Sequence, residues 1–425
     1  MKDFLKKIRH YLGNVKRYLI KLFIKIDATR CQKKIKRNVK ALECKDKIKV
    51  AFLQMYATSC QNLCIFDRML QSDLFDPYFI VNPDISRSYE NMIEQYEKTI
   101  KMLKEKYGSE RVLLGYDLEK KVFSDYSNDF DIMNTNNPYD VMAHKYFKIQ
   151  YWGKKCIPIF YISYFYMGRC HVTAENFSQP QFNYMWKVFV ENETAVSIAK
   201  EVELIHGKNV VLAGYPKMDE YSCLKEEKSE NKIVIISPHH TIYDNDWISI
   251  GSFLETNEII QKLPKLFPQI DFVFRPHPLL FETLKRFWSK EEIDSWLKEF
   301  LLNKNASYST EGNYLQLFKN SSALIHDCGS YMAEYFYTGK PCAFMYKANL
   351  NLDKSLTVFG KNCVEMHYPL RKENDFINFI QDVVIDGKDI KKRERDEFAG
   401  DKVMINYPHS TEFIMNNITN TLINN

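Results

Sequence analysis

Short apolar runs alternate with amphipathic segments along most of this chain. In the first half we expect strands at 48–55, 78–81, 111–116, 129–133, 156–164, 186–191 and 209–213, with helices at 62–71 and 89–107. In the second half the expected strands are 233–237, 271–275, 306–308, 323–326, 342–346 and 364–368. The expected helices there are 256–266, 289–301, 313–319, 331–338, 373–384 and 410–422. Strands separated by helical segments predict an α/β fold built of doubly wound parallel sheets.

A break in this pattern divides the chain into two halves. The turn sequence GYPKMD occupies 214–219, and a charged stretch at 225–232 follows it. A chain of 425 residues is long enough for two ordinary domains. We therefore expect one Rossmann-like domain at 45–222, a second at 230–408 that faces it across a cleft, and a closing helix at 409–425.

The stretch 321–346 predicts a strand, a tight turn, a helix and a second strand. Gly329 allows the sharp turn, Ser330 is a capping residue, and Gly339 with Pro341 ends the helix. Helix N-termini attract anions, and Glu334 lies one turn beyond Ser330 on the same face. The turn is therefore a candidate phosphate site in which Glu334 accepts ribose hydroxyls. The alternative interpretation is an ordinary strand-to-helix turn with a capping serine and no ligand, because the same residues are typical of both.

Two other strand ends carry polar side chains to the same edge of the second sheet. One continues as Ser237-Pro238-His239-His240-Thr241, and the other as Arg275-Pro276-His277-Pro278. Arginine binds phosphate in bidentate fashion, and histidine carries protons or donates to phosphate oxygens. Together with Asp327, Gly329 and Ser330, these residues predict a site for an activated anionic donor. The chain has no GxxxxGK[ST], GxGxxG or HExxH sequence, which argues against P-loop, dinucleotide and zincin chemistry.

The first 40 residues differ from the rest in charge. They hold 14 Lys/Arg and two Asp, whereas the whole chain carries a net charge of only +5. Apolar residues between Phe4 and Ile26 fall on one stripe of a helix, with the basic residues on the other face. Such a helix binds an anionic membrane surface. The alternative is a helix packed on the core with a solvated basic face. Nucleic acid is not expected, because no basic groove with interleaved aromatics follows.

Composition adds little more. Hydrophobic residues make up 45% and charged residues 27%, typical of a globular protein. Ten cysteines are scattered through apolar runs, which predicts reduced thiols in a cytosolic protein rather than a zinc site at Cys60 and Cys64. The longest near-apolar stretch, Ile157–Met167, is too short to span a bilayer. No metal and no cofactor are expected.

The ordered motifs of the second half resemble those of the CDP-glycerol glycerophosphotransferase family, the teichoic-acid primase and polymerase type. The family's GYPR.D, RxHP and DYSS elements correspond to GYPKMD at 214–219, RPHP at 275–278 and DCGSYMAE at 327–334, and its P-T-W/F-R strand end corresponds to SPHHT at 237–241. The resemblance implies a GT-B type fold, with an acceptor domain at 45–222 and a nucleotide-donor domain at 230–408.

The resemblance also implies an activity: transfer of glycerol phosphate from CDP-glycerol to a hydroxyl of a lipid-linked surface glycan, with release of CMP. It assigns His277 and Arg275 to the pyrophosphate, with Gly329 and Ser330 holding it, and Glu334 to the ribose. His239 or His240 would face the transferred group, and the same donor-binding set includes Ser237, Thr241 and Asp327. The enzyme would lie at the cytoplasmic face of the cell membrane as a peripheral protein.

One departure from the family concerns the acceptor side. The family's QxWHG element, whose histidine is taken as the base, is matched by Gln150-Tyr151-Trp152-Gly153, which lacks that histidine. His144 and His171 are the candidate substitutes. Two rivals stay open: a GT-B glycosyltransferase that uses a nucleotide sugar in capsule or lipopolysaccharide synthesis, and a membrane-attached scaffold that has lost catalysis.

Overall fold

The computed structural model describes residues 2–58, 61–227, 229–243, 249–310 and 313–423; the side chains of residues 2–10, 12, 171 and 172 are not described. The chain forms two compact units. Unit 1 comprises Met1–Tyr164, Ala174–Lys217 and His409–Asn425, and unit 2 comprises Phe165–Thr173 and Met218–Pro408. Both are Rossmann-like α/β units with an all-parallel main sheet. The division differs from the expected continuous ranges, because Phe165–Thr173 belongs to unit 2 and the last helix to unit 1.

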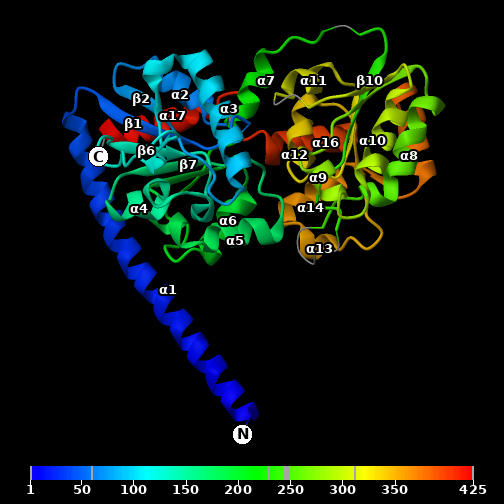
Figure 1. Ribbon diagram of the computed structural model, residues 1–425. Helices are drawn as coiled ribbons and strands as arrows, with labels where there is room; N and C mark the ends of the chain where they lie inside the picture. The colour runs from blue at the N-terminus through cyan, green and yellow to red at the C-terminus, as the bar shows by residue number, and fades with distance from the viewer. Residues whose placement is uncertain (1, 59–60, 228, 244–248, 311–312, 424–425) are drawn as a thin grey trace. The chain divides into compact units, whose positions relative to one another are not determined.

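Unit 1 is built on a seven-stranded sheet in the order β3-β2-β1-β6-β7-β8-β9 (Figure 1). Its strands are β1 Ile48–Gln54, β2 Phe75–Val81, β3 Val112–Leu114, β6 Ile132–Thr135, β7 Ile159–Ile162, β8 Lys187–Val190 and β9 Val210–Leu212; the hairpin β4 Tyr116–Asp117 and β5 Val122–Phe123 stands apart. Its helices are α1 Lys2–Ala41, α2 Leu63–Leu70, α3 Tyr89–Tyr107, α4 Ile149–Lys154, α6 Glu193–Val202 and α17 Ser410–Ile423, and α5 Cys170–Ser178 links the two units in sequence.

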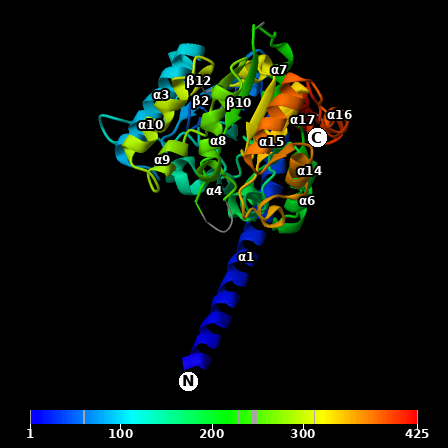
Figure 2. The ribbon, with the colours of Figure 1, turned by 90° about the vertical axis from the view of Figure 1, so that its right-hand side faces the viewer.

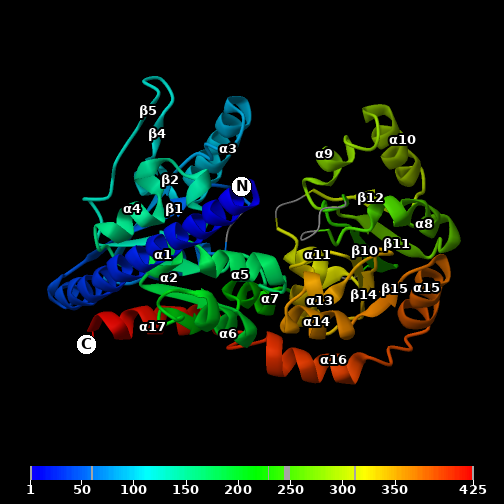
Figure 3. The same cartoon turned by 90° about the horizontal axis from the view of Figure 1, so that it is seen from below.

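One face of this sheet is packed by aromatic rings. Phe52 on β1 meets Phe66 on α2 at 5.1 Å between ring centroids, Phe79 on β2 at 5.8 Å and Phe160 on β7 at 6.0 Å. The C-terminal helix α17 packs against α1 and α2, as Figure 3 shows. Ile414, Ile418 and Leu422 of α17 are buried in this core. Their burial explains why the last helix belongs to the first sheet.

The N-terminal helix is present, and it carries two apolar stripes instead of one. Ala28, Cys31, Ile35 and Val39 are buried in unit 1 at spacings of three and four residues. At 100° per residue, the apolar stripe between Tyr11 and Ile26 lies about half a turn away around the helix axis. Its members are exposed, and Tyr11, Tyr18 and Phe23 are each 68% accessible. The C-terminal part of α1 is thus a packed core helix, whereas residues 13–23 present apolar and basic side chains outward.

Unit 2 contains a six-stranded sheet in the order β12-β11-β10-β13-β14-β15. Its strands are β10 Lys232–Ser237, β11 Ile270–Phe274, β12 Ala306–Tyr308, β13 Ala323–His326, β14 Cys342–Met345 and β15 Tyr368–Leu370. Its helices are α7 Asp219–Cys223, α8 Phe253–Leu266, α9 Leu280–Leu284, α10 Lys290–Leu301, α11 Leu315–Asn320, α12 Tyr331–Glu334, α13 Leu352–Ser355, α14 Val358–Glu365, α15 Glu373–Asn378 and α16 Lys392–Phe398.

Apolar side chains that alternate along the strands cover one face of this sheet. Val234 and Ile236 on β10 point to the same core as Phe272 and Phe274 on β11, because successive side chains of a strand point to opposite faces. Helices α8, α10 and α15 close this core, and α8 contacts α15 directly (Figure 2). Strand order places β10 beside both β11 and β13. From β10 the chain continues outward to β11 and β12. It then crosses back and adds β13, β14 and β15 on the other side of β10.

Candidate functional site

The candidate site lies in unit 2, where the strand order reverses between β10 and β13. In open α/β sheets, ligands bind outside the carboxyl ends of the strands at such a switch point. The loop after β10 carries His239 and His240, the loop after β11 carries His277, and the turn after β13 carries Gly329. The register pairs Ser237 with His326, so the loops after β10 and β13 begin at the same level.

Three imidazole rings gather at this edge. Ring centroids are 4.5 Å apart for His239 and His240, 4.2 Å for His240 and His277, and 4.8 Å for His239 and His277. The amide of His277 donates to the carbonyl of Pro238 at 2.9 Å, which joins the two loops directly. Among the described residues, these rings form a group that could hold a metal ion, with ligating nitrogens within 4.8 Å of one another.

Backbone amides orient two of the rings. Leu279 N–H donates to Nδ1 of His277 at 3.1 Å, and Thr241 N–H donates to Nδ1 of His239 at 3.3 Å. A neutral imidazole has one donor and one acceptor nitrogen, so a proton then resides on Nε2 of each ring. Both rings therefore present an N–H donor on the side away from their own loop.

All three histidines are neutral at neutral pH. Burial lowers the pKa of His240 to about 4 and that of His277 to about 3, and it holds the pKa of His239 well below its ordinary value. The charge of Arg169 adds to the effect on His239 and His240. Because desolvation disfavours the charged form, these rings act as hydrogen-bonding groups rather than as cations.

Asp327 anchors the loop after β10 instead of facing a ligand. It is fully buried, and its carboxylate accepts from the amide of His239 at 2.5 Å and from the amide and hydroxyl of Ser252 at 2.6 and 2.8 Å. Burial raises its pKa to about 7, although these hydrogen bonds oppose the shift. Asp327 therefore holds the histidine loop in place, and its membership of the expected nucleotide-binding set stays a prediction.

Two further members of the expected set also support the loops from within. The hydroxyl of Ser237 donates to the carbonyl of Arg275 at 2.6 Å, and Ser237 is buried. Thr241 is buried as well, and its hydroxyl lies 2.9 Å from Nδ1 of His239. Both therefore position the residues that carry the chemistry.

Ser330 and Glu334, the expected phosphate grip, bond to side chains of unit 2 in this structure. Helix α12 is a single turn, and Ser330 makes no capping hydrogen bond. The hydroxyl of Ser330 donates to one carboxylate oxygen of Glu334, and the hydroxyl of Tyr314 donates to the other. Glu334 is only 1% exposed. Both oxygens expected to bind ribose are thus engaged inside unit 2, because a buried carboxylate needs donors from its own fold.

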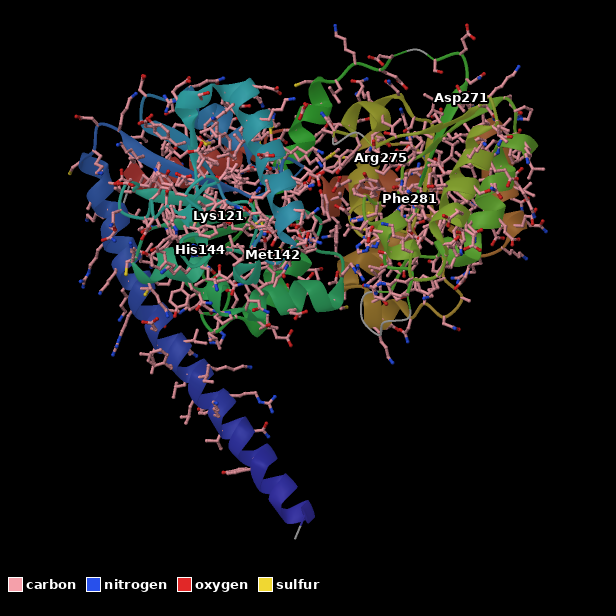
Figure 4. All side chains as sticks on the ribbon, viewed as in Figure 1. Lys121, Met142, His144, Asp271, Arg275 and Phe281 are labelled. Carbon is pink, nitrogen blue, oxygen red and sulfur yellow. The ribbon has the colours of Figure 1, made fainter. Side chains whose placement is uncertain are left out.

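Arg275 turns toward the same interior layer. It is 9% exposed, donates from Nε to the hydroxyl of Tyr331 at 3.4 Å and from Nη1 to Ser309 at 3.1 Å, and lies 5.4 Å from the ring centre of Tyr314. Figure 4 shows it at the end of β11 among the side chains of unit 2. Within the RPHP sequence, the imidazole of His277 therefore faces the other histidines, whereas the guanidinium of Arg275 faces the tyrosines.

Sequence reasoning missed Arg169. It belongs to the segment 165–173, which leaves the sheet of unit 1 and packs in unit 2. A single antiparallel bridge to Leu356 holds it, and the preceding carbonyl of Gly168 accepts from the amide of Thr357 at 2.8 Å. A Cβ on Gly329 would lie 3.1 Å from Cδ of Arg169, so the arginine passes close to the turn after β13. Only the tertiary fold brings this residue to the switch point, and no local motif marks it.

The residues expected on the acceptor side lie in unit 1. Trp152 is buried in α4 and donates from its indole to the carbonyl of Tyr146 at 2.7 Å. His144 stacks on Phe123 of the β4–β5 hairpin at 3.8 Å between centroids, and burial lowers its pKa. Figure 4 labels its position. The side chain of His171 lies outside the described part of the structure.

Comparisons with known proteins identify the fold. No protein-family model matches the sequence, and a search of curated proteins found no match. Among solved structures, a UDP-N-acetylglucosamine 2-epimerase aligns with a TM-score of 0.56 at 12% identity, over 88% of this chain and 96% of that one. The Neisseria meningitidis UDP-GlcNAc 2-epimerase bound to UDP-GlcNAc aligns with a TM-score of 0.54 at 11% identity, over 89% and 100%.

A third similar structure is the H444N variant of the wall teichoic acid polymerase TagF, with a TM-score of 0.55 at 14% identity over 98% of each chain. These identities support the fold and no finer statement. Within the described residues, no helix combines the length and the apolar character needed to cross a bilayer. The three structural alignments show that the chain has the GT-B type of architecture expected from its sequence.

Proposed function

We propose that this protein is a transferase that takes a nucleotide-activated donor, and that it moves glycerol phosphate from CDP-glycerol to a hydroxyl of a lipid-linked surface glycan. In this reaction an acceptor oxygen attacks the phosphorus that bears glycerol, the bond to the CMP phosphate breaks, and CMP leaves. The acceptor proton passes to a base. The observation that carries the proposal is the convergence of His239, His240 and His277 at the switch point of unit 2.

The site suits phosphoryl transfer chemically. Such transfer depends mainly on positioning and on stabilising charge on the phosphoryl oxygens. Neutral imidazole N–H groups on rigid loops are donors of this kind, and Pro238, Pro276 and Pro278 restrict those loops. The order of the motifs and the full-length alignment with TagF favour CDP-glycerol as the donor.

The test compares donors directly. Purified protein is incubated with a lipid-linked glycan acceptor and CDP-glycerol, UDP-GlcNAc or a CMP-sugar, and the released nucleotide is quantified by chromatography. We expect saturable CMP release from CDP-glycerol alone. Turnover with a nucleotide sugar only would replace this proposal by the glycosyltransferase alternative, which the alignment with UDP-GlcNAc enzymes favours. No turnover of any donor, with tight nucleotide binding retained, would support a scaffold.

We also propose that α1 holds the enzyme peripherally on an anionic membrane at its cytoplasmic face, where a lipid-linked acceptor resides. Exposed apolar residues such as Tyr18 and Phe23 lie on the stripe opposite the docked half of the helix, and Lys16, Lys21 and Lys25 accompany them. Apolar burial and electrostatic attraction act together in such helices. Because Ile24 packs against the core of unit 1 and Asp27 accepts a hydrogen bond from Tyr184, the appropriate deletion removes residues 2–23 only.

Vesicle cosedimentation tests this surface. The intact chain should pellet with vesicles that contain anionic lipid and be released as salt rises, since screening weakens exposed charge pairs. The 2–23 deletion should stay in solution while retaining CMP release from a soluble acceptor analogue. Equal pelleting of the two proteins would contradict the proposal.

A further inference from the structure

An amide oxygen without a partner lies at the carboxyl edge of the sheet in unit 1. It belongs to Asn82, the residue that follows β2, and Asn82 is only 3% exposed. No donor reaches its side-chain oxygen from any described residue. A buried acceptor oxygen that lacks a donor destabilises a fold unless a group from outside supplies one. Asn82 therefore marks a place where an external donor is expected.

This side chain lines a small cavity between the ends of three neighbouring strands. The backbone amide of Asn82 donates to the carbonyl of Gln54 at the end of β1, at 3.0 Å, and the amide of Asn136 after β6 donates to the carbonyl of Leu53 at 3.4 Å. The cavity measures about 10 Å³, which holds one oxygen atom of the size of a water molecule. It lies where the strand order of unit 1 reverses, between β1 and β6.

A side-chain donor borders the same cavity. The amide nitrogen of Asn137 lies 3.1 Å from the sulfur of Met55 and 3.4 Å from that of Met142, which Figure 4 labels. A thioether is a weak acceptor, so this N–H₂ group keeps most of its capacity to donate. The side-chain oxygen of Asn137 accepts from the amide of Tyr139 at 2.9 Å, which fixes the orientation of the group. The cavity thus combines an unpartnered acceptor with a weakly engaged donor.

A hydroxyl group matches this pair, because it donates to the oxygen of Asn82 and accepts from the nitrogen of Asn137. A metal cation does not match. The carboxylate beside the cavity, that of Asp140, accepts from the amides of Ile149 at 2.6 Å and Gln150 at 3.1 Å, and hard cations take six or more oxygen ligands. An unprotonated anion does not match either, because it has no proton to donate to Asn82.

The position of the cavity favours a hydroxyl that arrives with a ligand over a permanent water molecule. Asn137 and Tyr139 are half-buried, so the cavity lies directly beneath the surface of the edge. Leu53, Met55 and Phe147 supply apolar groups beside the polar pair. Ligand sites combine apolar lining with a few placed polar groups, and in open α/β sheets they lie outside the carboxyl ends of the strands at the switch point.

We propose that this cavity, here called the hydroxyl pocket (Asn82, Asn137, Leu53, Met55 and Phe147), binds one hydroxyl group of a sugar or polyol. The inference rests on the proposed function only for the role of that ligand as the acceptor of the transfer. Asn82 and Asn137 are then specificity residues, which select an acceptor that carries a hydroxyl at one position. A site built to hydrogen-bond a hydroxyl rejects the analogue that lacks it, because the polar groups are left unpaired.

The experiment is saturation-transfer NMR of the full chain without any nucleotide donor. Glycerol and methyl glucoside are the two probes, and they distinguish a polyol ligand from a sugar ligand. We expect a saturable signal from at least one of them. Asn82→Leu should weaken the binding of that probe by roughly 5- to 20-fold, the loss expected for one hydrogen bond to a hydroxyl.

Thermal unfolding of the ligand-free variants separates this role from a structural one. Because no described group of the fold donates to the side-chain oxygen of Asn82, Asn82→Leu should not lower the Tm. If this variant does not fold, Asn137→Asp replaces it. It keeps an oxygen for the amide of Tyr139 and loses the N–H₂ donor, so probe binding should weaken again.

Asn192→Ser is the matched control. Asn192 is a buried asparagine that follows β8 at the same edge. Its oxygen accepts from the amide of Ala195 at 2.8 Å, and its nitrogen donates to Glu191 at 2.8 Å, so both ends of its amide are engaged. Serine also caps helices, and the variant should fold and bind the probe with wild-type affinity.

Three outcomes would overturn the inference: no signal from either probe, wild-type probe affinity in folded Asn82→Leu, or a lost affinity that comes with a lowered Tm in that variant. Turnover of CDP-glycerol by an enzyme that binds neither probe would remove the hydroxyl pocket and leave the proposed function standing. Probe binding that depends on Asn82, in an enzyme that turns over no donor, would leave the pocket standing and remove the proposed function.

Discussion

The two units have the same strand order around the reversal point, yet they carry different chemistry there. In unit 1, the ends of β1 and β6 are lined by amides and hydroxyls that bond mostly to one another: Asn62 donates to Asn134 at 2.9 Å, and Gln61 donates to the carbonyl of Asn136 at 3.1 Å. In unit 2, the corresponding edge gathers three imidazoles and a buried arginine. The shared topology fixes where a ligand would bind, and the side chains determine which ligand it is.

The largest effect is expected from a substitution at the edge of unit 2, with no corresponding effect at the edge of unit 1. His277→Ala should lower nucleotide release by roughly 10²- to 10⁴-fold, because it removes an oriented donor at the reacting phosphate. Tyr56 follows β1 at the corresponding edge of unit 1, and its hydroxyl donates to Asp84. Tyr56→Phe should leave pyrophosphate affinity unchanged. The check is single-turnover kinetics together with calorimetry for both variants. Equal loss of pyrophosphate binding in both would erase the distinction between the edges.

The stabilities of the two units should depend on pH in opposite directions. In unit 1, burial raises the pKa of Glu203 from 4.5 to about 8, so the unfolded chain releases its proton first, and stability falls as pH rises through this window. In unit 2, burial lowers the pKa of His367 from 6.5 to about 3, so stability falls as pH drops from 6.5 toward 3.

Urea unfolding of matched variants measures these two contributions. Glu203→Gln should raise the free energy of unfolding by about 2–4 kcal/mol at pH 8.5 and change it little at pH 5. The glutamine amide does not ionise, so the variant avoids the cost of keeping a buried carboxyl group protonated or charged at high pH. His367→Asn keeps a donor for the carbonyl of Cys363, which His367 meets at 2.7 Å, and should flatten the decline below pH 6.5. Parallel pH profiles for wild type and both variants would show that neither group carries the effect.

A smaller effect is expected where the segment 165–173 enters unit 2. Gly360→Ala places a Cβ against the Gly168 carbonyl and should cost about 1–3 kcal/mol of stability, as overpacking typically does. Gly400→Ala is the control, because nothing lies within 4 Å of a Cβ there. Urea unfolding measures both variants, and equal stability of Gly360→Ala and Gly400→Ala would contradict the close packing of Gly360 on Gly168.

The smallest effect concerns Ser330. Its hydroxyl donates to Glu334, so Ser330→Ala should cost about 1 kcal/mol of stability and leave the KM for the donor unchanged. Steady-state kinetics and urea unfolding of this one variant give both quantities. A several-fold rise in KM without loss of stability would restore the helix-terminus grip that the sequence suggested.

Periodicity was sufficient for the sheets but not for the site. Apolar runs located the strands of both units, and Gly339 adopts the left-handed conformation that its position after a helix required, with φ of 66°. The strand expected at 364–368 begins later, at Tyr368, because Val364 lies in the last turn of α14, which ends at Glu365. Helices α4 and α6 were not anticipated, since they span only six and ten residues, which gives few turns over which a helical period can be recognised.

The site was only partly accessible from the sequence, for a physical reason. His239, His240 and His277 follow strands directly, and strand order brings such residues together. Whether a polar side chain faces a ligand or the interior depends on partners far away in the chain. Tyr314 engages Glu334, and the amide of Ser252 engages Asp327. Arg169 enters from a segment that begins in the other unit, a placement that no local pattern encodes.

The most direct test is ¹⁵N NMR of the histidine side chains at pH 7, recorded with and without CDP. We predict neutral rings for His239 and His277 with the proton on Nε2, and downfield shifts of their Nε2–H signals when CDP binds. Nδ1-protonated rings or imidazolium signals in the free protein, or CDP binding that leaves all three histidine spectra unchanged, would contradict a diphosphate held at the switch point of unit 2.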